Sequence, residues 1–144
     1  MAVMKIIVGV DDSAAGERAA RRAVDYARRL GADLDVVFVS HVPATVLAAM
    51  GGVPTIGEDF AGAQRTAVWD RIGPIIEGTG ARRLDLEGYP PDALVDLATS
   101  EKADLVVVGS RGRGDLASLF LGSTSHRVVN HAPCDVLVVR GEEA

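Results

Sequence analysis

A glycine-rich segment toward the C-terminal end of the chain carries residues that could bind phosphate. Gly109 follows an apolar run, Gly112 comes three residues later, and Gly122-Ser123-Thr124 follows after nine more residues. Glycines after a buried strand let the backbone turn sharply and direct its N–H groups toward an anion. A helix that opens at Gly122 would add free N–H groups and a positive dipole end. The pattern indicates a phosphate site, although a glycine-rich turn with a Ser/Thr helix cap has the same composition.

Two arginines and an acidic pair add to this candidate site. Arg111 and Arg113 lie inside the glycine-rich segment, where they either neutralise phosphate charge or are simply solvated. Asp11-Asp12 follows the apolar run 6–10. Carboxylates at the end of a strand can accept hydrogen bonds from a ribose or help to hold Mg²⁺. Because Asp12 or Ser13 also suits a helix N-cap, we interpret Asp12 as the cap and Asp11 as the candidate for the site.

Several known phosphate chemistries do not fit these residues. The chain has no G-x-x-x-x-G-K-[ST] sequence, and the turn after the run 6–10 reads Gly9-Val10-Asp11-Asp12-Ser13 instead of G-x-G-x-x-G. A phosphoacceptor receiver domain needs an aspartate after its third strand and a lysine after its fifth. Those positions are Glu87-Gly88 and Arg140 here. The H-[IV]-G-H and S-G-G-x-D-S motifs of adenylating or sulfurating enzymes do not occur either.

The histidines and the cysteine do not indicate a metal or a reactive centre. His41 lies in a segment that we expect to be a loop, and His126 and His131 are five residues apart. That spacing does not align two ligands on one helix face. We interpret Cys134 as a small buried residue that begins a strand, since nothing around it suggests a lowered pKa.

The elements that must position these residues follow from the apolar runs. The runs do not alternate with polar residues, which is typical of parallel strands covered on both faces by helices. They occupy residues 6–10, 36–39, 105–108 and 136–139, and a fifth strand is expected within 81–88. Helices are expected at about 14–30 (closed by Gly31), 59–77, from Pro91 onward and at 123–130. Gly73-Pro74 should break or kink the second helix, and 41–58 should be either a functional cover or disordered.

Composition limits the remaining classes. A chain of 144 residues fits one domain, 1–144, and its net charge of −5 argues against a general nucleic-acid binder. The longest uncharged stretch, 42–57, contains two prolines and three glycines and is shorter than the roughly 20 apolar residues that a membrane helix needs. We therefore expect neither nucleic acid nor membrane as a partner. Without a signal peptide or a cysteine pair, we expect a cytoplasmic protein.

The spacing of the glycine-rich segment resembles a known signature. G-x2-G-x9-G-[ST], carried here by Gly109, Gly112, Gly122 and Ser123, is similar to the ATP-binding motif of the universal stress protein family. The flanking sequences resemble that family as well, so the resemblance covers nearly the whole chain. They are residues 8–13, 88–90, 103–109 and 132–139.

The resemblance implies a fold and a site. The fold is a three-layer α/β sandwich of the adenine nucleotide alpha hydrolase-like (HUP) type, with a five-stranded parallel sheet in the order 3-2-1-4-5. ATP, with Mg²⁺ at Asp11, would lie across the C-terminal ends of the first and fourth strands. Adenine would meet backbone between Val39 and His41, and Gly122, Ser123 and Thr124 would hold the phosphates. The implied nucleotide-binding set is Gly9, Val10, Asp11, Val39, His41, Val108, Gly109, Arg111, Gly112, Arg113, Gly122, Ser123 and Thr124.

The resemblance also implies a class of function. It predicts a nucleotide-dependent stress-response or regulatory protein with at most slow ATP hydrolysis. The alternatives are a cyclic-AMP or AMP binder of the same fold and a weak ATPase. The run Val136–Val139 would form an edge strand, and because exposed edges pair readily, we expect a homodimer through it. The downstream partner is not predicted.

Overall fold

Five parallel strands form one sheet in the order β3-β2-β1-β4-β5. The strands are β1 (Lys5–Val10), β2 (Asp33–Ser40), β3 (Arg82–Glu87), β4 (Leu105–Gly109) and β5 (Asp135–Val139). The computed structural model describes residues 3–41, 48–49, 51, 54–110 and 122–141, and only the backbone of residues 54–59. The strand order and the strand within 81–88 are as the sequence predicted.

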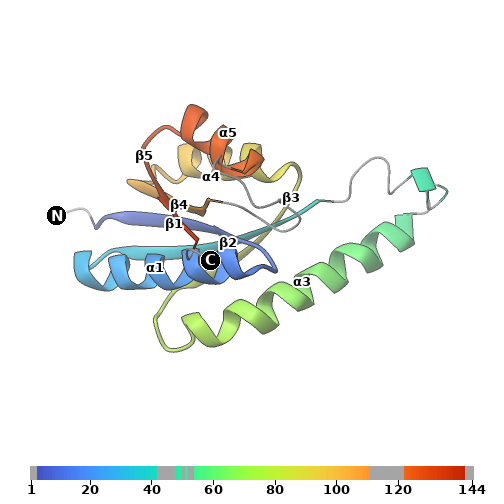
Figure 1. Cartoon of the computed structure of the whole chain (residues 1–144), viewed down its shortest axis with the longest axis horizontal. Helices are drawn as coiled ribbons and strands as arrows, with labels where there is room; N and C mark the ends of the chain where they lie inside the picture. The colour runs from blue at the N-terminus through green and yellow to red at the C-terminus, as the bar shows by residue number, and fades with distance from the viewer. Residues whose placement is uncertain (1–2, 42–47, 50, 52–53, 111–121, 142–144) are drawn as a thin grey trace.

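Helices cover both faces of the sheet and complete three layers (Figure 1). The helices are α1 (Ala14–Leu30), α3 (Pro54–Ile76), α4 (Pro90–Ser100) and α5 (Ser123–His131). Helices α1 and α3 pack on one face, and α4 and α5 pack on the other. Alternate residues of β2 therefore enter two different cores: Val36 and Phe38 face α1 and α3, whereas Val37 and Val39 face α4. Among the described residues, no helix is long and apolar enough to cross a membrane.

Helix α1 begins at a serine cap. The Ser13 side chain accepts a hydrogen bond from the N–H of Gly16 at 3.0 Å, and Gly31 ends the helix in the left-handed conformation with φ +62°. The interpretation of Asp12 as the cap was wrong. Its carboxylate lies 3.5 Å from Arg71 of α3, because Ser13 is the residue with extended backbone and the hydroxyl within reach of the first turn.

Helix α3 is longer than the sequence predicted and is not interrupted by Pro74. It begins at Pro54 instead of residue 59, with proline at a position where its missing N–H is not needed. Pro74 lies in the last turn, so few backbone hydrogen bonds remain for it to disturb. Val68, Ile72 and Ile76 are buried at helical spacing against the α1 side of the core. Their burial stabilises the helix through this proline.

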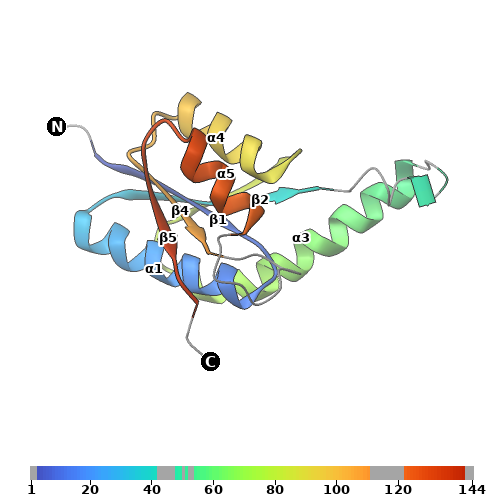
Figure 2. The same ribbon diagram turned by 45° about the horizontal axis from the view of Figure 1, so that its top comes forward.

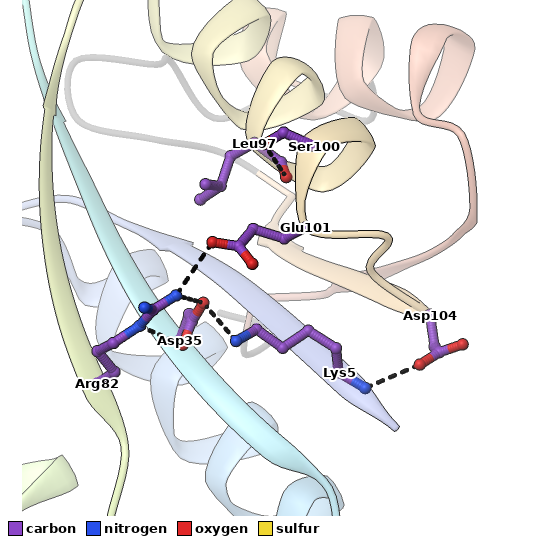
Figure 3. A network of polar contacts seen from close by, with 7 residues as sticks. All are labelled: Lys5, Asp35, Arg82, Leu97, Ser100, Glu101 and Asp104. Carbon is purple, nitrogen blue, oxygen red and sulfur yellow. Dashed lines mark hydrogen bonds and ion pairs between the residues drawn. The ribbon is translucent and has the colours of Figure 1, made fainter. Parts of the chain in front are cut away.

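A polar network lies under the opposite face, close to the start of the strands (Figure 3). The Asp35 carboxylate is 2% exposed and accepts hydrogen bonds from Nε and a terminal nitrogen of Arg82, at 3.1 and 2.8 Å. The Lys5 ammonium lies 2.9 Å from the same carboxylate, and Arg82 also reaches Glu101 at 3.3 Å. The network therefore connects β1, β2 and β3 with the residue that follows α4.

Candidate functional site

A cavity opens at the C-terminal ends of β1, β2 and β4. It lies where the strand order reverses between β1 and β4, which is where open α/β sheets usually bind ligands. Its lining residues are Gly9, Val10, Asp11, Gly16, Val37, Phe38, Val39, Pro90, Leu94, Val108, Gly109, Gly122, Thr124 and Ser125. The residues that the sequence predicted and that line this cavity are Gly9, Val10, Asp11, Val39, Val108, Gly109, Gly122 and Thr124.

The Asp11 carboxylate is positioned by the first turn of α1. One of its oxygens accepts a hydrogen bond from the Ser13 hydroxyl, which in turn accepts the N–H of Gly16. Gly16 lies directly under Asp11: a Cβ atom there would lie 2.6 Å from the Asp11 carbonyl oxygen and 2.9 Å from its backbone nitrogen. The helix cap and this glycine therefore hold the Asp11 backbone against α1, with the residue at the cavity wall.

Packing leaves little room for a side chain at two glycines of the predicted set. A Cβ atom on Gly9 would lie 2.7 Å from a Leu94 methyl group, so its absence lets α4 approach the sheet beside the cavity. A Cβ atom on Gly109 would lie 3.1 Å from the carbonyl oxygen of Ala15. These contacts give Gly9 and Gly109 a structural role that does not depend on a ligand.

Hydrogen bonds join the two ends of the glycine-rich segment. The N–H of Gly122 donates to the carbonyl of Ser110 at 2.6 Å, and the N–H of Ser110 donates to the carbonyl of Val139 at 2.9 Å. The Ser125 hydroxyl, in a residue that is 2% exposed, lies 3.1 Å from the same Ser110 carbonyl and 3.0 Å from that of Gly122. The start of α5 is therefore fixed to the ends of β4 and β5. Arg111, Gly112 and Arg113 lie outside the described residues.

The N-terminus of α5 can receive an anion. Gly122 is the N-cap, and no side chain caps the helix in the described part of the chain. Ser123 and Thr124 occupy its first two positions, where backbone N–H groups have no carbonyl of their own helix to bind. Thr124 lines the cavity, and Ser123 does not. This end of the cavity thus combines N–H groups, a hydroxyl and a positive dipole end, which together favour phosphate or carboxylate.

The other end of the cavity is apolar. Val37, Val39, Pro90 and Leu94 line it, and three of these side chains are nearly fully buried in the core between the sheet and α4. A flat apolar group would find van der Waals contact here without having to desolvate a charged side chain.

Val39 also offers a backbone carbonyl at this end. The Ser40 carbonyl accepts the Gly88 N–H at 3.1 Å and so points toward the β3 side. Because successive residues of a strand point their backbone groups to alternate edges, those of Val39 point toward β1. The last pair of β1 with β2 joins Val10 and Phe38, and in a parallel ladder this pair uses the Val39 N–H as donor to the Val10 carbonyl. The pairing of the two strands does not use the Val39 carbonyl, which can accept a hydrogen bond from a ligand.

His41 is held outside the cavity by aromatic and cationic neighbours. Its ring meets the exposed ring of Tyr89 edge to face at 5.9 Å, and Arg127 lies over the Tyr89 ring at 5.8 Å. Arg127 donates to Asp92 at 2.8 Å, and this hydrogen bond raises the pKa of the guanidinium. The cluster connects the end of β2 with α4 and α5, but His41 is not among the lining residues.

Other candidate chemistry is weak in the described structure. Among the residues described, no three His, Cys, Asp or Glu side chains lie together in a way that could hold a metal ion. Cys134 is half-buried, and burial raises the pKa of its thiol, with Asp135 and Asp104 adding to the effect. A thiol of this kind is a poor nucleophile at neutral pH.

The sequence did not identify six of the lining residues. They are Gly16, Val37, Phe38, Pro90, Leu94 and Ser125. The sequence does carry a signal for Gly16. Glycine weakens a helix, so a glycine three residues after a serine cap, among residues that favour a helix, indicates a close contact that a side chain would block. The apolar residues had no signal beyond their place in strands and helices, because a residue that lines a cavity is as apolar as one that fills the core.

Comparisons with known proteins agree on one family. The model of the universal stress protein family matches residues 3–140. A universal stress protein of Methanocaldococcus jannaschii is 32% identical over 139 residues, which cover 94% of this chain and 81% of that protein. The structure of the universal stress protein UspA from Lactobacillus plantarum superposes with a TM-score of 0.82 at 26% identity, over 97% of this chain and all of that one. A crystal structure of a universal stress protein in complex with cAMP gives a TM-score of 0.64 at 32% identity, over 96% and 98% of the two chains.

Proposed function

The chain belongs to the universal stress protein family, and we propose that it is an ATP-binding regulatory member of it. The observation that carries the proposal is that one cavity joins the apolar slot at the end of β2 to the N-terminus of α5, with Asp11 in its wall. An adenine nucleotide has the same sequence of parts, a flat apolar base, a polar ribose and an anionic phosphate chain.

The lining residues would divide the nucleotide between them. Adenine would lie against Val37, Val39 and Leu94 and hydrogen-bond the Val39 backbone. The α5 N-terminus and the Thr124 hydroxyl would hold phosphates. Asp11 would accept a ribose hydroxyl or, since a carboxylate beside polyphosphate needs a bridging cation, share Mg²⁺ with the phosphates. The sequence motif extends this set to Arg111, Gly112, Arg113 and Ser123, which do not line the described cavity.

We propose that binding, not turnover, is the physiological activity. Among the described lining residues Asp11 is the only carboxylate, and there is neither a lysine nor a histidine. A general base that activates water must lie within hydrogen-bond reach of it. A carboxylate engaged with the Ser13 hydroxyl and with Mg²⁺ would be a poor base, so hydrolysis should be slow at most.

A cyclic nucleotide is the second candidate ligand. The similar protein solved with cAMP is 32% identical to this chain, and the apolar slot would accept the same base. The two ligands differ at the phosphates: cAMP has a single phosphodiester charge, whereas ATP presents a chain of charged phosphates to α5 and to Mg²⁺. Discrimination should therefore depend on Asp11 and on the start of α5.

The test combines nucleotide identification with titration. Nucleotide released from the purified protein is identified by mass spectrometry, and ATP, AMP and cAMP are titrated by calorimetry with and without Mg²⁺. Thr124→Val should weaken ATP binding about tenfold, the scale of a hydrogen bond to a charged group. Thr99→Val is the matched control, because the Thr99 hydroxyl bonds only the Val95 carbonyl of α4 in the described structure. The proposal fails if ATP does not bind, or if both variants bind it as the wild type does.

We also propose that the protein forms a homodimer through β5. This strand is at the edge of the sheet, and Val136, Leu137 and Val138 are only half-buried there. The Val139 carbonyl points toward β4, where it accepts the Ser110 N–H, so Val138 points its backbone groups to the open edge. Antiparallel pairing with a second copy would satisfy those groups and give a two-fold axis.

A further inference from the structure

Four arginines surround a hollow on the α1 side of the sheet edge. Arg18, Arg21 and Arg22 project from one face of α1, and Arg140 follows β5. With Asp25, Val139 and Gly141, they line the hollow. Figure 2 shows the C-terminal end of β5 passing beside α1, as required for a surface built from both elements. We call these four side chains the arginine hollow.

The charge of the arginine hollow is not neutralised by the described residues. Asp25 is bound to Arg29 at 3.2 Å, and none of the four arginines makes a hydrogen bond or ion pair with another described residue. Some other arginines of this chain do have a carboxylate partner. Arg71, Arg82 and Arg127 each lie within 2.8 Å of a carboxylate oxygen. A local excess of positive charge therefore occurs on a chain whose net charge is −5.

Arg18 gives a second and independent observation. Its Nε is fully buried and has no hydrogen-bond partner in the part of the chain that the structure describes. A buried N–H that is not hydrogen-bonded costs about 1–3 kcal/mol, more when the group is charged. Arg21 and Arg22 are exposed, and solvation by water accounts for them. Solvation does not account for the buried Nε of Arg18. An anionic occupant would allow the guanidinium to turn toward it and to regain hydrogen bonds.

The shape of the arginine hollow favours an extended anion over a compact one. Arg18, Arg21 and Arg22 follow one helix face over four positions, a length of about 6 Å at 1.5 Å per residue. Alternate residues of an extended peptide lie about 6.6 Å apart on one side, so two acidic side chains match that length. A planar guanidinium binds a carboxylate through two parallel hydrogen bonds, and it binds phosphate in the same way, so the spacing of the arginines is what favours an extended acidic segment.

We propose that the arginine hollow is a docking site for an extended acidic segment of another protein. It shares no lining residue with the nucleotide cavity, so the two sites are separate surfaces of one domain. The proposal does not depend on which nucleotide binds. The partner would be recognised through the positive charge that the described residues of this chain leave unpaired.

The experiment measures binding of an acetylated hexaglutamate peptide by fluorescence anisotropy, with hexaglutamine as the neutral control. The wild type should bind the glutamate peptide only, and the affinity should fall as salt is raised. Arg22→Glu and Arg21→Glu should each weaken binding at least tenfold. Arg28→Glu is the matched control: it makes the same charge change on the same helix, but Arg28 lines a different hollow. It should leave the affinity within about twofold.

Three results would overturn the proposal. Equal loss in Arg22→Glu and Arg28→Glu would assign binding to net charge instead of the arginine hollow. Inorganic tripolyphosphate that displaces the peptide at equal or lower concentration, with the same dependence on Arg22, would make the hollow a small-anion site. Peptide binding only after Glu142→Gln and Glu143→Gln would make the chain's own tail the occupant. Circular dichroism and sedimentation check that each variant keeps the fold and the wild-type mass, and unchanged ATP titration distinguishes failure here from failure of the proposed function.

Discussion

The carboxylate of Asp35 and the guanidinium of Arg82 form a two-point hydrogen-bonded pair between β2 and β3, at 3.1 and 2.8 Å (Figure 3). Residues 35 and 82 are register partners in the sheet, and Lys5 contributes a second cation from β1. Asp35 is buried, but Lys5 and Arg82 are partly exposed, so water can solvate the two cations when the carboxylate is removed. We expect Asp35→Asn to lower the free energy of unfolding by about 2 kcal/mol, the scale of hydrogen bonds to a charged group. Urea denaturation measures it, and Asp33→Asn, at an exposed position of the same strand, should stay within about 0.5 kcal/mol. Equal losses in both variants would contradict the role of the pair.

The same carboxylate predicts how stability depends on pH. Burial raises the pKa of Asp35, but the hydrogen bonds and charges of Arg82 and Lys5 outweigh it, so the pKa is lowered on folding. The stabilisation is therefore complete above the unfolded value of about 4 and is lost as pH falls through the lower folded value. In acid titrations of unfolding free energy, the difference between wild type and Asp35→Asn should begin to shrink as pH falls below about 4, and it should vanish only below the folded pKa. A difference that stays constant down to pH 2 would exclude this carboxylate as the source.

Gly16→Ala tests the contact between α1 and Asp11, because the contact determines whether the substitution raises or lowers the free energy of unfolding. Alanine in place of a helix glycine normally stabilises by about 1 kcal/mol. Here the added Cβ would meet the Asp11 backbone at 2.6–2.9 Å, so we expect a loss of about 2 kcal/mol. Gly62→Ala in α3 is the control, because a Cβ there meets nothing within 4 Å and should stabilise. Thermal unfolding of both variants decides; stabilisation by Gly16→Ala would show that Asp11 is free to move.

Asp11→Asn tests the proposed cation. With Mg²⁺ present, the variant should bind ATP about tenfold more weakly, within the 1–3 kcal/mol scale of a charged partner. In EDTA, the difference in ATP affinity between wild type and variant should shrink. Without the cation, the Asp11 carboxylate of the wild type repels the phosphates, and the variant lacks this repulsion. Asp12→Asn is the control, since Asp12 pairs with Arg71 and does not line the cavity. Calorimetry that finds the two variants alike, with and without Mg²⁺, would assign Asp11 a structural role at the start of α1 instead of a role in binding.

Val138→Pro tests the dimer. Val138 points its N–H to the open edge of the sheet, so proline there should leave the pairing of β5 with β4 in place and remove a hydrogen bond to a second copy. We expect a dimer mass for wild type and a monomer mass for the variant in light scattering at tens of micromolar. A wild type that is monomeric, or a folded variant that is still dimeric, would refute pairing through β5.

The sequence predicted the sheet and the place of the cavity because these depend on local patterns. Apolar runs are recognisable within a few residues. The glycine spacing resembles that of a known family, and the strand order was predicted from that resemblance. The sequence could not predict that Gly9 packs closely against Leu94 and Gly109 against Ala15, since those contacts join distant elements. A valine at Gly109 would therefore test the fold as much as phosphate binding, and Thr124 is the cleaner position.

The charged networks were beyond prediction for the same reason. Lys5, Asp35 and Arg82 come together only in the observed register of three strands, and no residue near Asp35 in the sequence indicates which cations it meets. Pro74 was misjudged because local propensity predicts a break, whereas the burial of Ile72 and Ile76 maintains the helix. In each case a tertiary contact decided what the local sequence could not.

The hydrogen bond between Gly122 and Ser110 has a mechanical consequence. It places the N-cap of α5 directly on the residue that follows β4, and Ser110 in turn donates to the last residue of β5. A substitution that displaces the end of either strand should therefore displace the start of α5 with it, and so alter how the cavity receives an anion without changing any residue that lines it.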